Sequence, residues 1–290
     1  MDKTLFTGVC TALVTPFIGR QINYPMVDRL LERQITAGVP AIVLGGTTGE
    51  SPTLSDKEKL DLFYRGKSFA KDNCLIIAGT GSNSTEHTIL LSKEAEKAGA
   101  DALLVVAPYY NKGNPEGLYL HFAAVAKSVN IPIIVYNVPS RTGVDIPVSV
   151  YKKLSQIPNI AGVKEASTDI TKITKIRNVC GGSFAIWSGN DDQIVPAISL
   201  GGLGVISVLS NIYPAETVAM VNAALDGDFD TAAALQTQLS EFVDLLFSEV
   251  NPIPVKYAMQ HLGYDCGPCR LPLGPISSSN KAKIDTYFAM

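Results

Sequence analysis

The sequence LIIAGTGSNSTEHTILLSKEAEKAGADALLVV, residues 75–106, places two short apolar segments on either side of a longer amphipathic one. The apolar runs Leu75–Ala78 and Ala102–Val106 are typical of strands that are buried on both faces. The segment Thr85–Ala98 between them has helical spacing, and Gly99 stands where a helix should end. This stretch therefore predicts a strand–helix–strand unit, the building block of parallel sheets.

The same pattern continues along most of the chain, where strand-like runs start roughly 20–35 residues apart, the room that one such unit needs. The other strand-like runs are Val9–Val14, Ala41–Leu44, Ile133–Tyr136, Ile160–Lys164, Phe184–Trp187 and Gly204–Ser207. Helical patterns include Tyr24–Ala37, Asp56–Lys71, Leu118–Val129 and Ala215–Leu225. Strict alternation of eight strands and eight helices predicts an α/β fold, a (β/α)8 TIM barrel. A doubly wound open sheet is the alternative, because both folds use buried parallel strands.

The pattern changes after Asp226. The segments Phe229–Phe247, Val255–Leu262 and Lys281–Phe288 have helical character, and no strand-like run follows. We therefore expect a catalytic barrel of residues 1–226 and a C-terminal helical extension of residues 227–290. The polar stretch Ser277–Asn280 is expected to be a loop before the last helix.

Composition excludes several classes of protein. The 290 residues are 46% hydrophobic with a formal net charge of -3, and no basic stripe points to nucleic acid. No apolar run reaches the ~18 residues of a membrane span, and the N-terminus lacks the apolar core of a signal peptide. Five cysteines, an odd number, suggest reduced thiols, so we expect a cytoplasmic protein. Cys266 and Cys269 form a lone C-x-x-C, which we interpret as a reduced structural pair.

Lys164 is the sharpest candidate for a catalytic residue. In a (β/α)8 barrel the active site lies at the carboxyl ends of the strands, and Lys164 ends the otherwise apolar run Ile160–Lys164. Burial favours the neutral amine, the form that attacks a ketone. The alternative is a structural ion pair with a carboxylate such as Glu165.

The ends of two other strands supply polar groups. The loop Gly45–Ser51 contains Thr47 and Thr48, and its backbone N–H groups can hold a carboxylate or phosphate. It lacks the lysine of a nucleotide P-loop, and an ordinary turn is the alternative. Tyr136 can act as a general acid or base, and Arg141 in the following loop can bind a carboxylate. A structural or solvated role is the alternative for both.

Two further strand ends give weaker signals. Tyr109 and Tyr110 are adjacent, so one can enter the pocket while the other faces elsewhere; aromatic packing is the alternative. In the glycine-rich run 201–207, the carbonyl of Ile206 could form a hydrogen bond in the site. Zinc-binding spacing, a Gly-x-Ser-x-Gly elbow and a dinucleotide fingerprint are all missing, so we expect neither a metal nor a nicotinamide cofactor.

Taken together, these motifs resemble the dihydrodipicolinate synthase family, within the broader group of pyruvate lyases that includes N-acetylneuraminate lyase. The motifs that match are Gly8–Pro16, Gly46–Glu50, Pro108–Asn111, Tyr136–Gly143, Gly162–Glu165, Gly204–Val208 and Asn251–Lys256. They span essentially the whole chain. The arginine in Pro139–Gly143 suits a small second substrate with a carboxylate, whereas sialic acid lyases have another sequence there.

The resemblance implies an aldolase-type lyase of lysine and diaminopimelate biosynthesis, which condenses pyruvate with L-aspartate 4-semialdehyde through a Schiff base on Lys164. No cofactor is needed, because the protonated imine activates the substrate. The implied roles are proton transfer for Tyr136, with Thr47 and Tyr110; pyruvate binding for Thr48, Gly49 and Ile206; and binding of the second carboxylate for Arg141.

The resemblance also implies a homo-oligomer, usually a tetramer built as a dimer of dimers, in which Tyr110 reaches the neighbouring subunit's site. Feedback-sensitive members bind L-lysine at a subunit interface and carry a glutamate at the position of His87 and a histidine at that of Lys59. Weak or absent inhibition by lysine is therefore expected here. The rival interpretations are another pyruvate-dependent aldolase, acting on a sugar acid, and a keto-acid sensor without catalysis.

Overall fold

In the computed structural model, which describes residues 4–289, eight parallel strands form a closed barrel. The strands are β1 (Gly8–Ala12), β4 (Ala41–Leu44), β5 (Leu75–Gly79), β6 (Ala102–Val106), β7 (Ile133–Asn137), β8 (Ile160–Glu165), β9 (Ala185–Ser188) and β10 (Gly204–Ser207). The first and last strands pair with each other, with Cys10 opposite Ile206. The predicted (β/α)8 barrel is confirmed, because an open sheet would leave these two strands unpaired.

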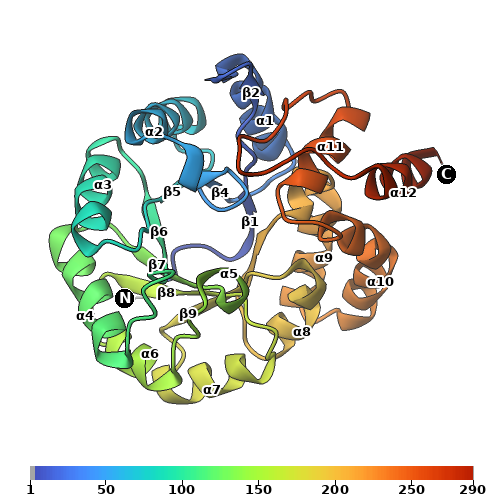
Figure 1. Ribbon diagram of the computed structural model, residues 1–290. Helices are drawn as coiled ribbons and strands as arrows, with labels where there is room; N and C mark the ends of the chain where they lie inside the picture. The colour runs from blue at the N-terminus through green and yellow to red at the C-terminus, as the bar shows by residue number, and fades with distance from the viewer. Residues whose placement is uncertain (1–3, 290) are drawn as a thin grey trace.

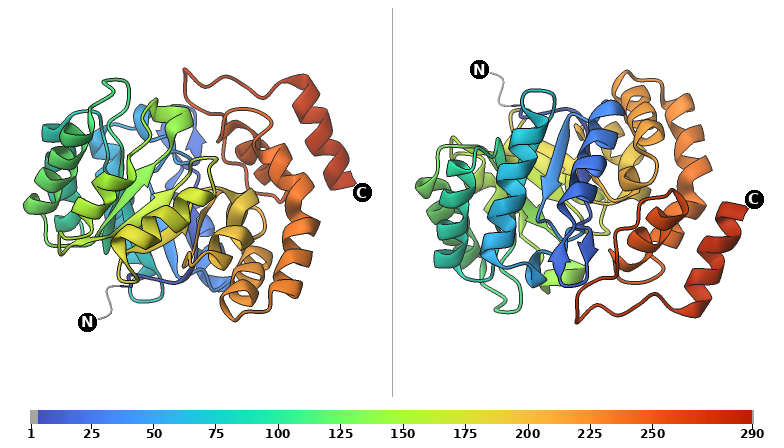
Figure 2. Two further views of the ribbon diagram at one scale, coloured as in Figure 1. Left: turned by 90° about the horizontal axis from the view of Figure 1, so that it is seen from below. Right: turned by 90° about the horizontal axis from the view of Figure 1, so that it is seen from above.

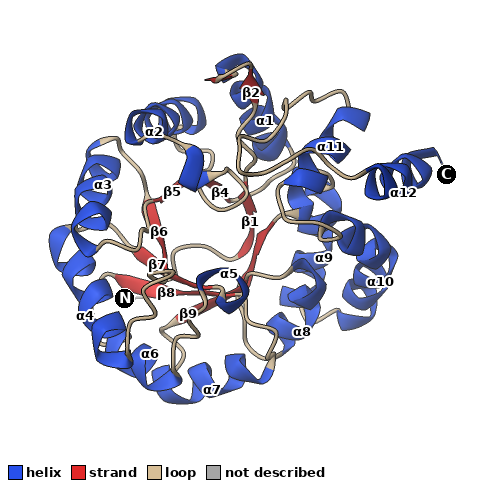
Figure 3. Cartoon of the chain, viewed as in Figure 1, coloured by secondary structure: helices blue, strands red, loops and turns tan. Residues whose placement is uncertain are grey.

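Helices surround the strands, as the view along the barrel axis shows (Figures 1 and 3). They are α1 (Tyr24–Thr36), α2 (Asp56–Ala70), α3 (Thr85–Lys97), α4 (Pro115–Ser128), α6 (Val148–Leu154), α7 (Thr171–Cys180), α8 (Ile194–Ser199) and α9 (Pro214–Leu225). The loops contain further short elements. These are the hairpin of β2 (Phe17–Ile18) and β3 (Gln21–Ile22), the single helical turn α5 (Pro139–Thr142), and three 3-10 turns, η1 (Ser51–Thr53), η2 (Asp191–Gln193) and η3 (Leu209–Asn211). These elements are too short for hydrophobic periodicity to predict them.

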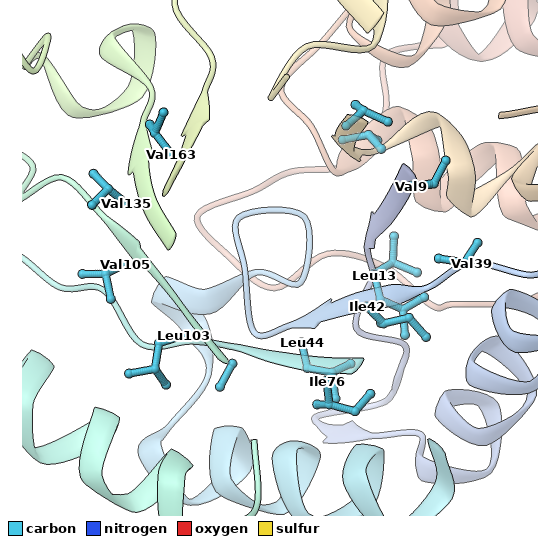
Figure 4. Close-up of a cluster of buried hydrophobic side chains, with 14 of the residues drawn as sticks. Val9, Leu13, Val39, Ile42, Leu44, Ile76, Leu103, Val105, Val135 and Val163 are labelled. Carbon is cyan, nitrogen blue, oxygen red and sulfur yellow. The ribbon is translucent and has the colours of Figure 1, made fainter. Parts of the chain in front are cut away.

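Alternate residues of each strand point to opposite faces, which divides the core into two layers. One layer lies between strands and helices and includes Val135 and Val163 (Figure 4). The other fills the barrel interior and includes Tyr136 and Trp187. Because Val163 faces the helices, its neighbour Lys164 faces the interior.

The C-terminal extension consists of α10 (Phe229–Leu246), α11 (Ile253–His261) and α12 (Ser278–Ala289). These helices gather on one side of the barrel (Figure 2), where α10 packs on α8 and α9. The loop expected at Ser277–Asn280 is wrong, because α12 begins at Ser278. Ser277 Oγ accepts a hydrogen bond from the Asn280 backbone N–H (3.3 Å), so this serine caps the helix. Within residues 4–289, no helix is both long and apolar enough to cross a membrane.

Candidate active site

A pocket of about 370 Å³ lies at the carboxyl ends of the strands. Its walls come from the loops after β4, β5, β6 and β7, and they include Thr47, Tyr109, Tyr136 and Arg141. Polar groups from four different strand ends therefore converge on one space, as expected for the active site of a barrel enzyme.

Lys164 does not line this pocket itself, but it is buried inside the barrel, 5% exposed, next to Tyr136, which does. It stands opposite Tyr136 in the strand register, and its Nζ is 4.4 Å from the centre of the Tyr136 ring. Gly189, at the end of the next strand, leaves room for the lysine, since a Cβ there would lie 3.1 Å from Lys164 Cε. The amine is thus held next to the phenol ring, and the missing side chain at Gly189 leaves room for the lysine stem.

An ion pair between Lys164 and Glu165 was the alternative explanation for this lysine, and the structure does not form it. Glu165 faces the surrounding helices, where its carboxylate accepts hydrogen bonds from Asn137 Nδ2 (2.8 Å) and Tyr151 OH (3.2 Å). The cation that pairs with Glu165 is Lys172, at 3.7 Å.

The loop after β4 approaches the site with its backbone. A Cβ at Gly49 would lie 3.1 Å from Thr15 Oγ1 and 3.2 Å from the Leu13 carbonyl, so a larger residue would displace the chain. Thr47 lines the pocket, while Thr48 is buried and does not line it. Glu50 accepts a hydrogen bond from Lys256 Nζ (2.8 Å) in a buried ion pair, which ties the loop to the C-terminal extension.

Five predicted site residues do not line the pocket of their own chain: Lys164, Thr48, Gly49, Tyr110 and Ile206. Tyr110 is 88% exposed, whereas Tyr109 lines the wall. The prediction that the two tyrosines face different ways is therefore confirmed. Ile206 is fully buried inside the barrel opposite Cys10.

Arg141 lies on α5 at the mouth of the pocket. Its side chain is exposed, and one guanidinium nitrogen donates to the Asn251 carbonyl (3.1 Å). Asn251 also donates from Nδ2 to Thr48 Oγ1 (3.0 Å). One residue of the C-terminal extension thus links the loop after β4 to the loop after β7.

Sequence reasoning missed Asn251 and Asp191 as parts of the site. Asn251 stands in a motif used only for the family resemblance, with nothing local to place it beside Thr48. Asp191 follows β9, a strand end that was not considered. Its Oδ2 accepts from the backbone N–H groups of Val208 and Leu209, both at 2.9 Å, and so joins the loops after β9 and β10. Burial raises the pKa of this carboxyl group, and hydrogen bonds from Ser207, Leu209 and Val208, followed by the nearby Lys164 charge, oppose the increase.

The described residues show no cluster of three or more His, Cys, Asp or Glu side chains placed to hold a metal ion. All five cysteines are free thiols. Burial raises the pKa of both Cys266 and Cys269 to about 12, so both thiols are protonated at neutral pH.

The profile of the Dihydrodipicolinate synthetase family matches residues 5–289. The chain belongs to this family. A 4-hydroxy-tetrahydrodipicolinate synthase from Lachnoclostridium phytofermentans is 46% identical over 282 residues, which cover 97% of this chain and 96% of the relative.

Solved dihydrodipicolinate synthases have the same fold. The crystal structure of the Aquifex aeolicus enzyme is 41% identical with a TM-score of 0.96, and the match covers 98% of this chain and 97% of that one. The Cyanidioschyzon merolae enzyme, crystallised with lysine bound, is 38% identical with a TM-score of 0.96 over 99% of this chain and 98% of that one. The expected dihydrodipicolinate synthase family and its lyase activity are therefore confirmed.

Proposed function

We propose that this chain condenses pyruvate with L-aspartate 4-semialdehyde to form 4-hydroxy-tetrahydrodipicolinate, with Lys164 as the Schiff-base residue. The observation that carries this proposal is a buried lysine amine 4.4 Å from the Tyr136 ring centre, at the carboxyl end of a barrel strand. A desolvated amine beside a phenol can attack a ketone and exchange protons with the groups around it. The names of the curated relatives support this choice of reaction.

The chemistry proceeds in four steps. The Lys164 amine attacks the keto carbon of pyruvate, and loss of water forms the protonated imine. The imine withdraws electrons, so the pyruvate methyl group loses a proton and becomes an enamine carbon. That carbon attacks the aldehyde of the second substrate, whose oxygen takes up a proton. Finally, the amino group of the second substrate displaces the Lys164 nitrogen and closes a six-membered ring, which frees the enzyme.

The remaining side chains would bind substrates and move protons. Tyr136 is placed to pass protons to and from the imine, and the hydroxyl of Thr47 in the same pocket can extend the relay. Thr48 and the N–H groups near Gly49 would hold the pyruvate carboxylate. Arg141, at the mouth, would hold the carboxylate of L-aspartate 4-semialdehyde. In this proposal the Ile206 carbonyl faces the imine.

Tyr110 would complete the relay from a second subunit. Its side chain is 88% exposed and does not line the pocket of its own chain, yet its hydroxyl group matches the role implied by the family motif. We propose a homo-oligomer, a tetramer built as a dimer of dimers, in which this tyrosine enters the neighbouring site.

Borohydride trapping tests the proposal. Incubation with pyruvate and borohydride should add one reduced pyruvate group, and peptide mass analysis should place it on Lys164. Lys164→Ala should abolish the adduct, whereas Lys153→Ala, at an exposed ion pair with Glu116, should keep it. An adduct on another lysine would contradict the assignment. Turnover of aspartate semialdehyde, measured in an assay coupled to a downstream reductase, should then exceed turnover of sugar-acid substrates.

A further inference from the structure

Asn137, the last residue of β7, is fully buried and bonds to separate segments of the chain. Its Nδ2 donates to Glu165 Oε1 and to Asp145 Oδ1, each at 2.8 Å. Its Oδ1 accepts from the Ile146 backbone N–H at 3.0 Å. Both amide hydrogens and the amide oxygen therefore have partners. Turning the amide over would face its oxygen toward two carboxylates, so one orientation is strongly favoured.

The segment that Asn137 closes is the loop that carries Arg141. The chain leaves β7 at Asn137, passes through α5 and returns at Ile146, whose N–H bonds to the Asn137 side chain. One side chain thus joins the two ends of the loop. Thr142 braces the loop from within, since its hydroxyl donates toward the carbonyls of Val138 (3.1 Å) and Val144 (2.9 Å). The loop is therefore held internally, and the Asn137 hydrogen bonds at its base help to place it, together with the Arg141–Asn251 contact.

Glu165 connects that base to the strand of the reactive lysine. It stands opposite Asn137 in the register of β7 and β8, and it directly follows Lys164. Its carboxylate also accepts from the Ser167 N–H (2.8 Å) and from Tyr151 OH (3.2 Å), which fixes its position. A single amide–carboxylate hydrogen bond therefore runs from the Arg141 loop to the residue next to Lys164.

We propose that Asn137 is a positioning residue for the second substrate. It holds the Arg141 loop against the strand of Lys164, and so sets the distance between the guanidinium that binds a carboxylate and the amine that forms the imine. This inference rests on the proposed function, in which Arg141 binds L-aspartate 4-semialdehyde. Orientation of this kind matters because a displacement of about 1 Å can cost on the order of 100-fold in rate.

The test compares three variants of the full-length enzyme. Asn137→Ala should raise the KM for aspartate semialdehyde about tenfold or more, while borohydride trapping of pyruvate stays within about threefold of wild type. Hydrogen exchange at the Ile146 amide should accelerate. Lys153→Ala, at an exposed ion pair with Glu116 that lies outside this hydrogen-bond network, should change neither KM. Asp145→Ala, whose side chain is 56% exposed, removes one of the Asn137 bonds and the ion pair with Lys172, and should give a smaller shift in the same direction.

Several outcomes would overturn the inference. One is an unchanged semialdehyde KM in Asn137→Ala, and another is an equal loss of pyruvate trapping, which would indicate general disruption. If Asn137→Ala does not fold, Asp145→Ala decides, and an unchanged semialdehyde KM in that variant counts against the inference.

A double variant separates this inference from the role of Arg141. If Asn137 acts through Arg141, Asn137→Ala with Arg141→Ala should have a semialdehyde KM no higher than Arg141→Ala alone. Additive effects would overturn the positioning role while leaving the proposed function in place. An Arg141→Ala variant with an unchanged semialdehyde KM would overturn the proposed role of Arg141, and this inference with it.

Discussion

Neighbouring residues at the ends of β7 and β8 face opposite sides of the barrel. Tyr136 and Lys164 point inward, and Lys164 Nζ lies 4.4 Å from the centre of the Tyr136 ring. Asn137 and Glu165 point outward and bond to each other at 2.8 Å. On each strand, the inward residue thus belongs to the reactive site, and the next residue forms the hydrogen bond that supports it from the outside. The period of two in a strand makes this division possible without any additional element.

Arg141 is expected to serve the second substrate more than pyruvate. Arg141 is exposed and lines the pocket, whereas Lys164 is 5% exposed inside the barrel. Arg141→Ala should therefore raise the KM for aspartate semialdehyde by about tenfold or more, since a hydrogen bond to a charged group contributes about 1.5–3 kcal/mol. Arg65→Ala, which breaks an ion pair with Asp28 on the outside of the barrel, is the matched control. Steady-state kinetics with each substrate varied in turn measure the two KM values. A larger increase in the KM for pyruvate would count against a role of Arg141 in binding the second substrate.

Inhibition by L-lysine is expected to be weak or absent. Lys59 lines the pocket and is 7% exposed. The Asp56 carboxylate, which could attract a cationic ligand, accepts a hydrogen bond from His87 Nε2 at 2.9 Å. A second ammonium group would meet a like charge and an occupied carboxylate, which should cost at least about tenfold in affinity.

Activity should therefore stay nearly constant at lysine concentrations that stop a sensitive homologue assayed in parallel. His87→Glu combined with Lys59→His should increase sensitivity. Strong inhibition of the wild-type enzyme by sub-millimolar lysine would show that another group binds the ligand.

At the scale of elements, helix α2 is anchored at its N-terminus to the C-terminal extension. Ser55 and Glu58 form a reciprocal capping box. The Glu58 carboxylate also binds Arg270 through two nitrogens, at 2.6 and 2.9 Å. Hydrogen bonds from Arg270 are the main cause that lowers the pKa of Glu58 to about 2. The helix start and the extension therefore stabilise each other.

The Glu58 contact should contribute stability that depends on pH. Because its pKa is lower in the folded state than the ordinary value of 4.5, the contribution is present above about pH 4.5 and disappears as the pH falls toward about 2. Glu58→Gln should lower the free energy of unfolding at pH 7 by about 1–2 kcal/mol, a range reduced for partial exposure. The difference in unfolding free energy between Glu58→Gln and wild type should become smaller below pH 4.

Denaturant unfolding at fixed protein concentration from pH 2 to pH 7 measures this effect. Glu94→Gln, at an exposed pair with Lys97, should differ little from wild type at any pH. If the loss of unfolding free energy in Glu58→Gln stays constant down to pH 2, the contribution of Glu58 does not depend on its ionisation, and the prediction is wrong.

At the scale of the whole molecule, the pocket of one chain lacks a hydroxyl group that the proposed relay needs. Tyr110 projects outward at 88% exposure with a φ of 72°, in the left-handed region that is costly for a non-glycine residue. An aromatic side chain presented in this way suits insertion into a second copy of the chain.

Hybrid oligomers should therefore recover activity. Lys164→Ala and Tyr110→Phe chains are each expected to be inactive or weak alone, but a mixed oligomer contains one site with both native groups. Subunit exchange followed by assay should restore part of the wild-type rate, whereas mixtures kept from exchanging should not. No recovery in hybrids verified by native mass spectrometry would mean that Tyr110 acts within its own chain or not at all.

Local sequence determined much of this protein. Hydrophobic periodicity located the eight barrel strands to within about two residues, since buried strands and amphipathic helices have distinct periods. Lys164 stood out because a lysine ending an apolar strand conflicts with local preference, and such conflicts mark functional sites. The loop expected at Ser277–Asn280 was wrong because serine favours both loops and helix caps.

Tertiary structure alone decided closure of the barrel, since β1 and β10 lie nearly 200 residues apart and their pairing has no local signal. It also placed Asn251 beside Thr48 and Arg141. In the folded chain, Glu165 accepts a hydrogen bond from Asn137 and pairs with Lys172, not with Lys164. These contacts join residues distant along the chain, so their geometry depends on how whole elements pack. Sequence shows which groups are available at the strand ends, and the packing of the barrel determines which of them meet.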